Sequence, residues 1–435
     1  MVSVIVPVYN GSDSLRRCLE AIAASNYARY ECIVVDDGST DDSRATSRQF
    51  ATQVVELTEG PFGPAHARNC GAEAACGDIL FFVDADVVIR SDTVSKVADT
   101  FARHPHVDAV FGSYDDSPDK KDFVSQYKNL SHHFVHQNGH EQAVTFWSGC
   151  GAVRRKVFLE VGGFNKDRYR CPSIEDIELG YRMRAAGHEI MVNKAIQVKH
   201  LKLWTLRGMM KADIFDRAIP WTQLILRERD LPGDLNLRLS QRVSALLLCV
   251  LLLHLGLTAF FHNTVLLPLL AGLFLLLIGY WNWTEGVPPL SRLSRRAESV
   301  IYTLMGAIGG LAVYFGIVWM LIPLGLLLAG MLAGRWLPYS GALWKQALFT
   351  SLVLASASGL GLLIVTFPVW LSVPLLLLIA LIVLLNFEFY AFFARKRGPM
   401  FALAVFPFHL LYYLYSVLTF ALVAGLHTWN VGVRR

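Results

Sequence analysis

The position of the long apolar stretches is the feature that most constrains this chain. Hydrophobic residues make up 54% of its 435 residues, and they concentrate after about Arg242. A helix needs about 20 mostly apolar residues to cross a bilayer, and several stretches in this part approach or exceed that length. The first 242 residues are mixed in polarity, as in a globular α/β protein. We therefore predict an α/β domain at 1–202, amphipathic interfacial helices at 203–242 and an all-α, multi-span transmembrane domain at 243–435.

The transmembrane domain is predicted to cross the membrane six or seven times. The predicted spans are Val243–Phe261, Val265–Trp281, Val300–Gly334, Leu348–Thr366, Val369–Leu385 and Met400–Leu426. Val300–Gly334 is too long for one straight span, so it forms either one kinked helix or a hairpin. With the first domain inside, only the hairpin returns both Arg292 and the Arg395–Arg397 cluster to the cytosolic side. The positive-inside rule thus favours seven crossings.

The charge is divided between the two halves of the chain. From Val243 onward ten Lys and Arg residues accompany three acids, and the whole chain carries +5, so the first 242 residues carry −2. The positive excess belongs to the loops of a membrane domain and is not a footprint for nucleic acid. The N-terminus lacks a charged leader, and seven cysteines form no CxxC pair. We expect reduced thiols, no signal peptide, and a cytosolic first domain at the plasma (inner) membrane.

Strand and helix patterns alternate in the first domain. The predicted strands are Val2–Val8, Cys32–Val35, Gln53–Leu57, Asp78–Val83 and Ala109–Tyr114, and the helices between them include Ser12–Ser25, Pro64–Cys76 and Ser91–Arg103. This alternation predicts parallel βαβ units with helices on both sheet faces. Ligands of such sheets bind beyond the carboxyl ends of the strands. Five polar residues at these ends are expected to converge on one crevice: Asn10, Asp36, Asp37, Asp84 and Asp86.

The segment "DILFFVDADVV" ends a buried strand pattern with two acids, Asp84 and Asp86. Alternate residues of a strand share a face, so both carboxylates are able to approach one hard divalent cation. An unpaired buried carboxylate costs several kcal/mol, so the pair calls for a partner. The alternative is a strand-end pair that caps the next helix. Taken alone, this short DxD pattern fits both interpretations.

Further motifs accompany the DxD pattern in a fixed order. They are "VSVIVPVYNGSDSL", "VVDDGSTDDS", "GPAHARNCGAEAACGDILFFVDADV", "FWSGCGAVRRKVFLEVGGF" and "IEDIELGYRMRAAGHEI". Together they resemble the pattern of glycosyltransferase family 2 over roughly residues 1 to 230. The resemblance implies a Rossmann-like GT-A catalytic domain. It also implies inverting, metal-dependent transfer of a sugar from a nucleotide sugar to an acceptor hydroxyl.

The resemblance assigns roles to individual residues. The nucleotide-sugar site would comprise Pro7, Val8, Tyr9, Asn10, Asp36, Asp37, Gly38, Ser39, Arg68, Asn69 and Asp84. Mg²⁺ or Mn²⁺ would be bound by Asp86 with Asp84 and His200. Asp176 in the "ED" pair would be the general base, with Glu175 beside it. The acceptor side would include Trp147, Ser148 and Gly149.

Several of these assignments have a structural alternative. "IEDIELGYRMRAAG" is also a good amphipathic helix, whose acidic start stabilises the helix dipole without any catalytic role. His200 is either a metal or phosphate ligand or a buried structural histidine, and Trp147 to Gly149 fit ordinary packing as well. Four histidines at helical spacing are interpreted as a solvated helix face: His132, His133, His136 and His140.

The expected function is that of a membrane-bound inverting glycosyltransferase of the cell envelope. It would transfer a sugar from a nucleotide sugar, expected to be UDP-linked, to a lipid or lipid-linked acceptor. A processive polysaccharide synthase is the first alternative, but Arg217 and Trp221 in "RAIPW" lack the Gln and the spacing of its QxxRW motif. The spans also hold few of the polar side chains that a saccharide channel needs. The second alternative is a lipid transporter or scaffold with an inactive head, which the intact acids disfavour.

Overall fold

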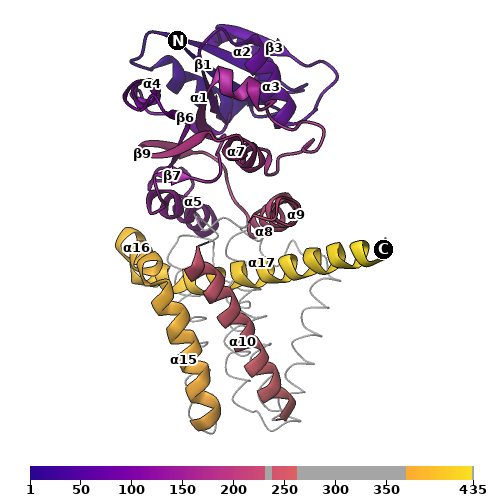
Figure 1. Ribbon diagram of the computed structural model, residues 1–435. Coiled ribbons are helices and arrows are strands. Elements are labelled where there is room, and N and C mark those ends of the chain that lie inside the picture. Colours follow the sequence, from indigo (N-terminus) through magenta and orange to yellow (C-terminus); the bar gives the residue numbers. More distant parts are fainter. Residues whose placement is uncertain (231–237, 262–368, 434–435) are drawn as a thin grey trace, which may run out of the picture. The chain divides into compact units, whose positions relative to one another are not determined.

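The computed structural model describes residues 1–230, 238–261 and 369–433, and the other residues are drawn in grey (Figure 1). The predicted spans Val265–Trp281, Val300–Gly334 and Leu348–Thr366 lie outside the described residues. Contacts divide the chain into two compact units. The first combines Met1–Val243 with Phe387–Arg435, and the second is Ser244–Asn386. The last two helices thus group with the α/β domain.

The first unit is built on a mixed nine-stranded sheet with the order β3-β2-β1-β4-β8-β6-β9-β5, and β7 pairs with β9. The strands are β1 Val2–Val8, β2 Tyr30–Asp36, β3 Gln53–Glu56, β4 Ile79–Val83, β5 Val87–Val88, β6 Val107–Tyr114, β7 Gln142–Ala143, β8 Cys150–Arg154 and β9 Glu189–His200. β3, β2, β1 and β4 run parallel, as predicted. β8 lies between β4 and β6 and runs antiparallel to both. The sheet is therefore mixed, whereas the alternation of strands and helices in the sequence predicted parallel units only.

Helices cover both faces of the sheet, because successive side chains of the central strands point to opposite faces and nearly all of them are buried. On β1, Ile5 belongs to one core, while Val4 and Val6 belong to the other. The first core also contains residues of α3 Pro64–Ala74, α6 Arg155–Glu160 and α7 Glu175–Ala185. The second core contains residues of α1 Ser12–Ala23 and α4 Thr93–Arg103. Helix α2, Ser43–Phe50, follows β2. The predicted Rossmann-like α/β domain is therefore confirmed.

Helix α5, Phe123–Gln137, packs against α16 Phe387–Arg397 and α17 Pro399–Val433 within the first unit. The ring of Phe123 lies 4.7 Å from that of Phe401. Polar contacts reinforce this packing: Lys396 Nζ lies 2.5 Å from Asp116, and Arg397 Nε donates to Gln126 Oε1 at 2.6 Å. The basic cluster expected in a cytosolic loop thus contacts the α/β domain.

The segment predicted to be interfacial forms short helices, α8 Leu206–Lys211, the π-helix η1 Ala212–Ala218 and α9 Ile219–Glu228. Among the described residues, two helices are long and apolar enough to cross a membrane, at Leu239–Leu257 within α10 (Leu239–Phe261) and at Pro399–Thr428 within α17. Helices α15 (Val369–Leu385) and α16 pass the same test only as a bent pair.

Candidate active site

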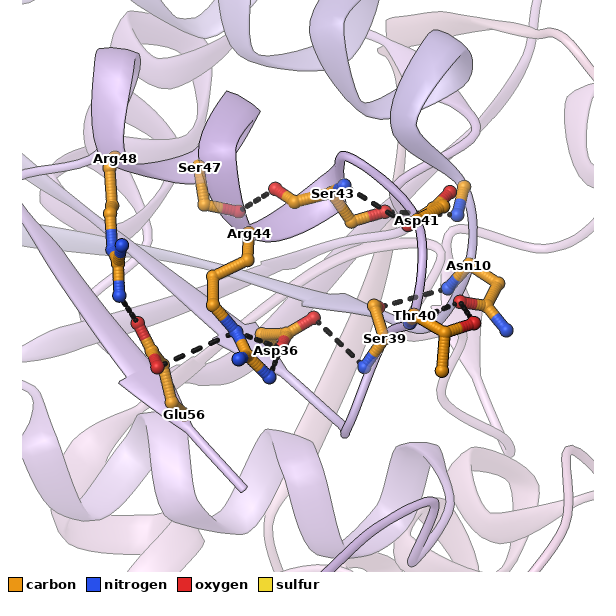
Figure 2. A network of polar contacts seen from close by, with 11 residues as sticks. Asn10, Asp36, Ser39, Thr40, Asp41, Ser43, Arg44, Ser47, Arg48 and Glu56 are labelled. Atoms are coloured by element: carbon orange, nitrogen blue, oxygen red, sulfur yellow. Dashed lines mark hydrogen bonds and ion pairs between the residues drawn. The ribbon is translucent and has the colours of Figure 1, made fainter. Parts of the chain in front are cut away.

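The loops after β1 and β2 are joined by hydrogen bonds from both sides (Figure 2). Asn10 has a left-handed backbone conformation, with φ of 50°, and its Oδ1 accepts from the Thr40 amide at 2.8 Å and hydroxyl at 3.2 Å. The Asn10 amide donates to Ser39 Oγ at 3.0 Å, and the Gly11 amide donates to Ser43 Oγ at 3.1 Å. The loop after β2 and the first residue of α2 therefore hold the loop that leads into α1 through the protein's own hydrogen bonds.

Both acids at the end of β2 are buried and bonded within the protein. Asp36 is fully buried, and its Oδ2 accepts from Arg44 Nε at 3.1 Å and Nη2 at 3.0 Å (Figure 2). Asp37 is 4% exposed, and its two oxygens accept from the amides of Phe62 at 2.9 Å and Gly63 at 2.8 Å. In this structure Asp36 and Asp37 therefore position the neighbouring helix and loop.

Four further residues predicted for the nucleotide site, Pro7, Val8, Tyr9 and Gly38, lie at the ends of β1 and β2. Tyr9 is 49% exposed at the crevice end of β1, while Val8 is buried and Pro7 is half-buried. Gly38 has φ of 79°, and a Cβ there would lie 3.1 Å from the backbone of Gly60. Only glycine fits this backbone conformation and close approach without strain.

Arg68, on α3, joins the two acidic motifs. Its Nη2 donates to Asp84 Oδ1 at 2.7 Å, and its Nη1 donates to Glu175 Oε1 at 2.9 Å. Arg68 and Glu175 are nearly buried, whereas Asp84 is 32% exposed. Burial opposes the charge of Arg68, but Asp84, Glu175 and Asp176 outweigh it and raise the pKa of the guanidinium. The guanidinium of Arg68 thus binds one acid of the DxD pattern, Asp84, and one acid of the ED pair, Glu175.

Asn69 follows Arg68 but is not part of this cluster. Its Nδ2 donates to the Phe164 carbonyl at 2.8 Å, and its Oδ1 accepts from the Phe164 amide at 2.9 Å. Because both polar ends of the side chain bind the backbone of Phe164, Asn69 holds the segment after α6 against α3.

Asp86 and His200 form a second pair, with Asp86 Oδ2 3.4 Å from His200 Nε2. His200 is 5% exposed and Asp86 33%. Burial opposes ionisation of Asp86, but the hydrogen bond with His200 and the charges of His200 and Lys202 lower the pKa of Asp86 overall. The side chains are contributed by the end of β9 and the turn after β4.

The Asp86–His200 pair has the ligand types and the spacing that a divalent cation needs. The described residues hold no group of three or more His, Cys, Asp or Glu side chains arranged around a metal ion. Neighbouring ligands of an octahedral ion, each at about 2.1 Å, lie about 3 Å apart, near the 3.4 Å observed. A carboxylate and an imidazole suit Mn²⁺, and Asp86 is partly open to further ligands. The pair therefore fits a cation that takes its remaining ligands from a bound molecule or water.

Asp176 lies in the first turn of α7 and is held by Ser148. Its Oδ2 accepts from the Ser148 amide at 3.0 Å and hydroxyl at 3.2 Å. Burial, followed by the charge of Glu175, raises the pKa of Asp176 to about 6. Trp147 precedes Ser148, and its ring would lie only 2.7 Å from a Cβ at Gly149. Of the residues predicted for the acceptor side, Ser148 contacts the predicted base, and Trp147 and Gly149 are its neighbours in the chain.

The interpretation of the four histidines as a solvated helix face was wrong for His132, His133 and His136, which lie on α5 and are buried or half-buried, whereas His140 follows the helix. His133 and His136 are buried, and their Nδ1 atoms donate to the carbonyls of Tyr114 at 2.7 Å and Gly112 at 3.0 Å. Only His140 is exposed. The polar sequence of α5 concealed this burial, because imidazoles reach backbone carbonyls of β6 that an apolar side chain would leave unpaired.

An aromatic wall, defined as Tyr114, His132, Trp147 and His200, connects His200, the partner of Asp86, with Trp147, which precedes the partner of Asp176, Ser148. Tyr114 stacks on His200 with centroids 4.3 Å apart, and it lies 4.2 Å from His132 and 5.0 Å from Trp147. Burial lowers the pKa of His132 well below its usual value, so this ring is neutral. Tyr114 was missed in the sequence, although its place at the carboxyl end of β6 follows the same rule that selected the acids.

The comparisons with known proteins agree with this geometry. A family model described as glycosyl transferase family 2 matches residues 3–162. A glycosyltransferase of Haloferax volcanii, AglE, is 40% identical over 91 residues, which are 20% of this chain and 30% of that protein. A validoxylamine A glucosyltransferase of Streptomyces hygroscopicus subsp. jinggangensis is 27% identical over 227 residues, 45% of this chain and 54% of that protein. The chain thus covers about half or less of these relatives.

Among solved structures, a mannosyltransferase of Pyrobaculum calidifontis in complex with GDP-Man and Mn²⁺ is 26% identical, with a TM-score of 0.41. The match covers 53% of this chain and 64% of that one. The family match spans β1 to α6 and includes Asp37, Arg68 and Asp86. Residues 3–162 of this chain therefore match the glycosyltransferase family 2 domain.

Proposed function

We propose that this protein is a membrane-bound inverting glycosyltransferase with Asp176 as its general base. The observation that carries the proposal is the environment of Asp176, whose carboxylate is held by Ser148 and has a pKa raised to about 6. A base with a pKa slightly below neutral is ionised at physiological pH and still able to take a proton. Glu175 is bound to Arg68, which leaves Asp176 as the acid of the pair that is free of an ion pair in the described structure.

In the proposed reaction, the acceptor hydroxyl attacks the anomeric carbon of the donor sugar while Asp176 takes its proton. The new glycosidic C–O bond forms as the bond between that carbon and the diphosphate oxygen breaks. The bonding electrons leave with the diphosphate, and one displacement of this kind inverts the anomeric carbon. The fixed Ser148 contacts orient the carboxylate for this transfer.

Asp86 and His200 would hold Mg²⁺ or Mn²⁺ at the other side of the crevice. When bound, the ion supplies Lewis-acid charge that stabilises the leaving diphosphate. Asp84, kept in place by Arg68, would contact the ribose or the sugar. The exposed ring of Tyr9 and the preformed loop of Asn10 and Ser39 would receive the nucleotide, which we propose to be UDP.

The acceptor is proposed to be a lipid or lipid-linked saccharide in the plasma membrane, with the catalytic domain on the cytosolic side. The apolar helices at Leu239–Leu257 and Pro399–Thr428 support membrane attachment. The orientation is supported by the basic residues Lys396 and Arg397, because the positive-inside rule favours the cytosol for such a cluster.

The proposal is tested with the full chain purified in detergent, with UDP-sugars and GDP-sugars as donors and total membrane lipid as acceptor. Transfer should require Mn²⁺ or Mg²⁺, rise with added lipid, and disappear in Asp176→Asn and Asp86→Ala. Glu59→Gln, a change on an exposed loop, is the control that should keep full activity. Transfer that persists in Asp176→Asn at the wild-type rate would exclude Asp176 as the base.

A further inference from the structure

Asn129 of α5 is bonded to the proposed metal ligand His200. His200 Nδ1 lies 2.7 Å from Asn129 Oδ1, and Asn129 Nδ2 donates to the Ser125 carbonyl at 2.9 Å. Asn129 is 1% exposed and His200 5% exposed, so water does not compete for this contact. The chain after His200 is fastened to the same turn of α5, because the Trp204 amide donates to Ser125 Oγ at 2.8 Å.

These contacts determine which nitrogen of His200 carries a proton. The Ser125 carbonyl only accepts hydrogen bonds, so the amide nitrogen of Asn129 must face it and the amide oxygen must face His200. Oδ1 also only accepts, and the His200 nitrogen opposite it must therefore be an N–H donor. The neutral ring then has its lone pair on Nε2, whereas the cationic ring donates from Nε2 to Asp86 Oδ2 at 3.4 Å, and a bound divalent cation replaces that proton.

The orientation of the His200 ring is fixed as well as its tautomer. Tyr114 stacks on one face with an interplanar angle of 9° and centroids 4.3 Å apart. A rotation of the ring that exchanged its two nitrogens would break the bond to Asn129 and bury an unpaired amide oxygen. The lone pair of Nε2 is thus kept toward Asp86.

We infer that Asn129 is a positioning residue that holds His200 in the Nδ1–H tautomer and so prepares Nε2 to bind the divalent cation with Asp86. The inference rests on the proposed metal site. Partners of this kind, which bind the far nitrogen of a metal-ligating histidine, change metal affinity about 10- to 100-fold when they are removed. The assignment therefore predicts a measurable effect of a residue that does not touch the cation.

The test measures binding of Mn²⁺ to the full chain in detergent, by the electron paramagnetic resonance of free Mn²⁺, with UDP or GDP present in separate titrations. Asn129→Leu removes the acceptor at similar volume and should weaken Mn²⁺ binding about 10- to 100-fold. Asn129→Asp keeps an acceptor for Nδ1–H and should bind Mn²⁺ within about threefold of the wild type. Nitrogen coupling to bound Mn²⁺, read by electron spin-echo modulation, should follow the same order.

Asn193 offers a matched control on the same strand as His200. Its Nδ2 donates to Thr100 Oγ1 at 2.8 Å and its Oδ1 accepts from the Ala195 amide at 2.9 Å, away from the Asp86–His200 pair. Asn193→Leu therefore removes two hydrogen bonds of a half-buried asparagine and should leave Mn²⁺ affinity unchanged.

The outcomes separate this inference from the proposed function. If His200→Ala weakens Mn²⁺ binding but Asn129→Leu does not, the metal site stands and the role of Asn129 is wrong. An equal loss in Asn129→Leu and Asn129→Asp would mean that packing and not the acceptor matters, which also overturns the inference. If the wild type does not bind Mn²⁺, or if His200→Ala and Asp86→Ala bind it normally, the metal site itself is wrong.

Discussion

The two ends of the crevice are built in different ways. At the nucleotide end, Asp37 accepts from backbone amides of a nearby loop, and Asn10 and Ser39 join the loops after β1 and β2. At the catalytic end, Arg68 and Glu175 are 107 residues apart in the sequence and form a side-chain ion pair, and His200 and Asn129 are 71 apart. Hydrogen bonds between a side chain and a backbone amide of a nearby loop form once those loops fold. Contacts between side chains distant in the sequence form only when the whole sheet is assembled. Substitutions at the catalytic end should therefore reduce activity or stability more than substitutions at the nucleotide end.

The largest effect is expected for Asp176→Asn. The amide keeps the shape of the side chain but cannot take the acceptor proton, so the rate of transfer should fall about 10²- to 10⁴-fold. Nucleotide affinity should be unchanged, because Asp176 lies at the catalytic end. Initial rates and nucleotide titration of the same preparation measure both, and a loss of nucleotide binding would contradict the separation of the two ends.

The second largest effect is expected for Arg68→Met. It leaves Glu175 buried without its cation and frees Asp84, and removal of one partner of a buried pair costs about 3–5 kcal/mol. Thermal or urea unfolding of the full chain measures the loss.

Arg48→Met is the matched control for this prediction at the nucleotide end. Arg48 pairs with Glu56 at 2.6 Å but is 63% exposed, so its loss should cost no more than about 1 kcal/mol. If both variants lose the same stability, the proposed difference between the two ends is wrong.

The third prediction concerns pH. Because the pKa of Asp176 is raised to about 6 and the base acts only when ionised, activity should be constant well above pH 6 and be lost as pH falls through it. At pH 5 the expected loss in kcat/KM is about tenfold. A pH profile of kcat/KM at a fixed donor concentration measures this dependence. If activity is lost only near pH 4, the pKa of Asp176 is not raised.

The fourth prediction concerns Asp37→Asn. One of its two oxygens becomes an amide nitrogen, so the bond to either the Phe62 or the Gly63 amide is lost. The free energy of unfolding should fall by about 1–3 kcal/mol, and nucleotide affinity should fall with it as the loop loosens. Mn²⁺ affinity without nucleotide should stay the same, and a parallel loss of Mn²⁺ binding would indicate that the two ends are coupled.

Much of the fold was predictable because it is encoded in local patterns. The apolar runs of β1, β2 and β4 and the amphipathic helices α1, α3 and α4 lie within a few residues of the predicted ranges. The antiparallel insertion of β8 between β4 and β6 was not predicted, because strand pairing depends on contacts between segments distant in sequence. The same reason explains why α5 was misinterpreted, since its histidines pair with carbonyls of β6.

The sequence by itself determined the order of the acidic motifs and their place at strand and helix ends, because alternation and apolar runs are local properties. It also determined the resemblance of residues 3–162 to glycosyltransferase family 2, which the family model matches. Only the tertiary structure decided the partners of these residues, such as Arg68 for both Asp84 and Glu175, Phe164 for Asn69, and Asn129 for His200. The physical reason is that a hydrogen bond depends on distance and direction in space, which the spacing of residues along the chain does not specify.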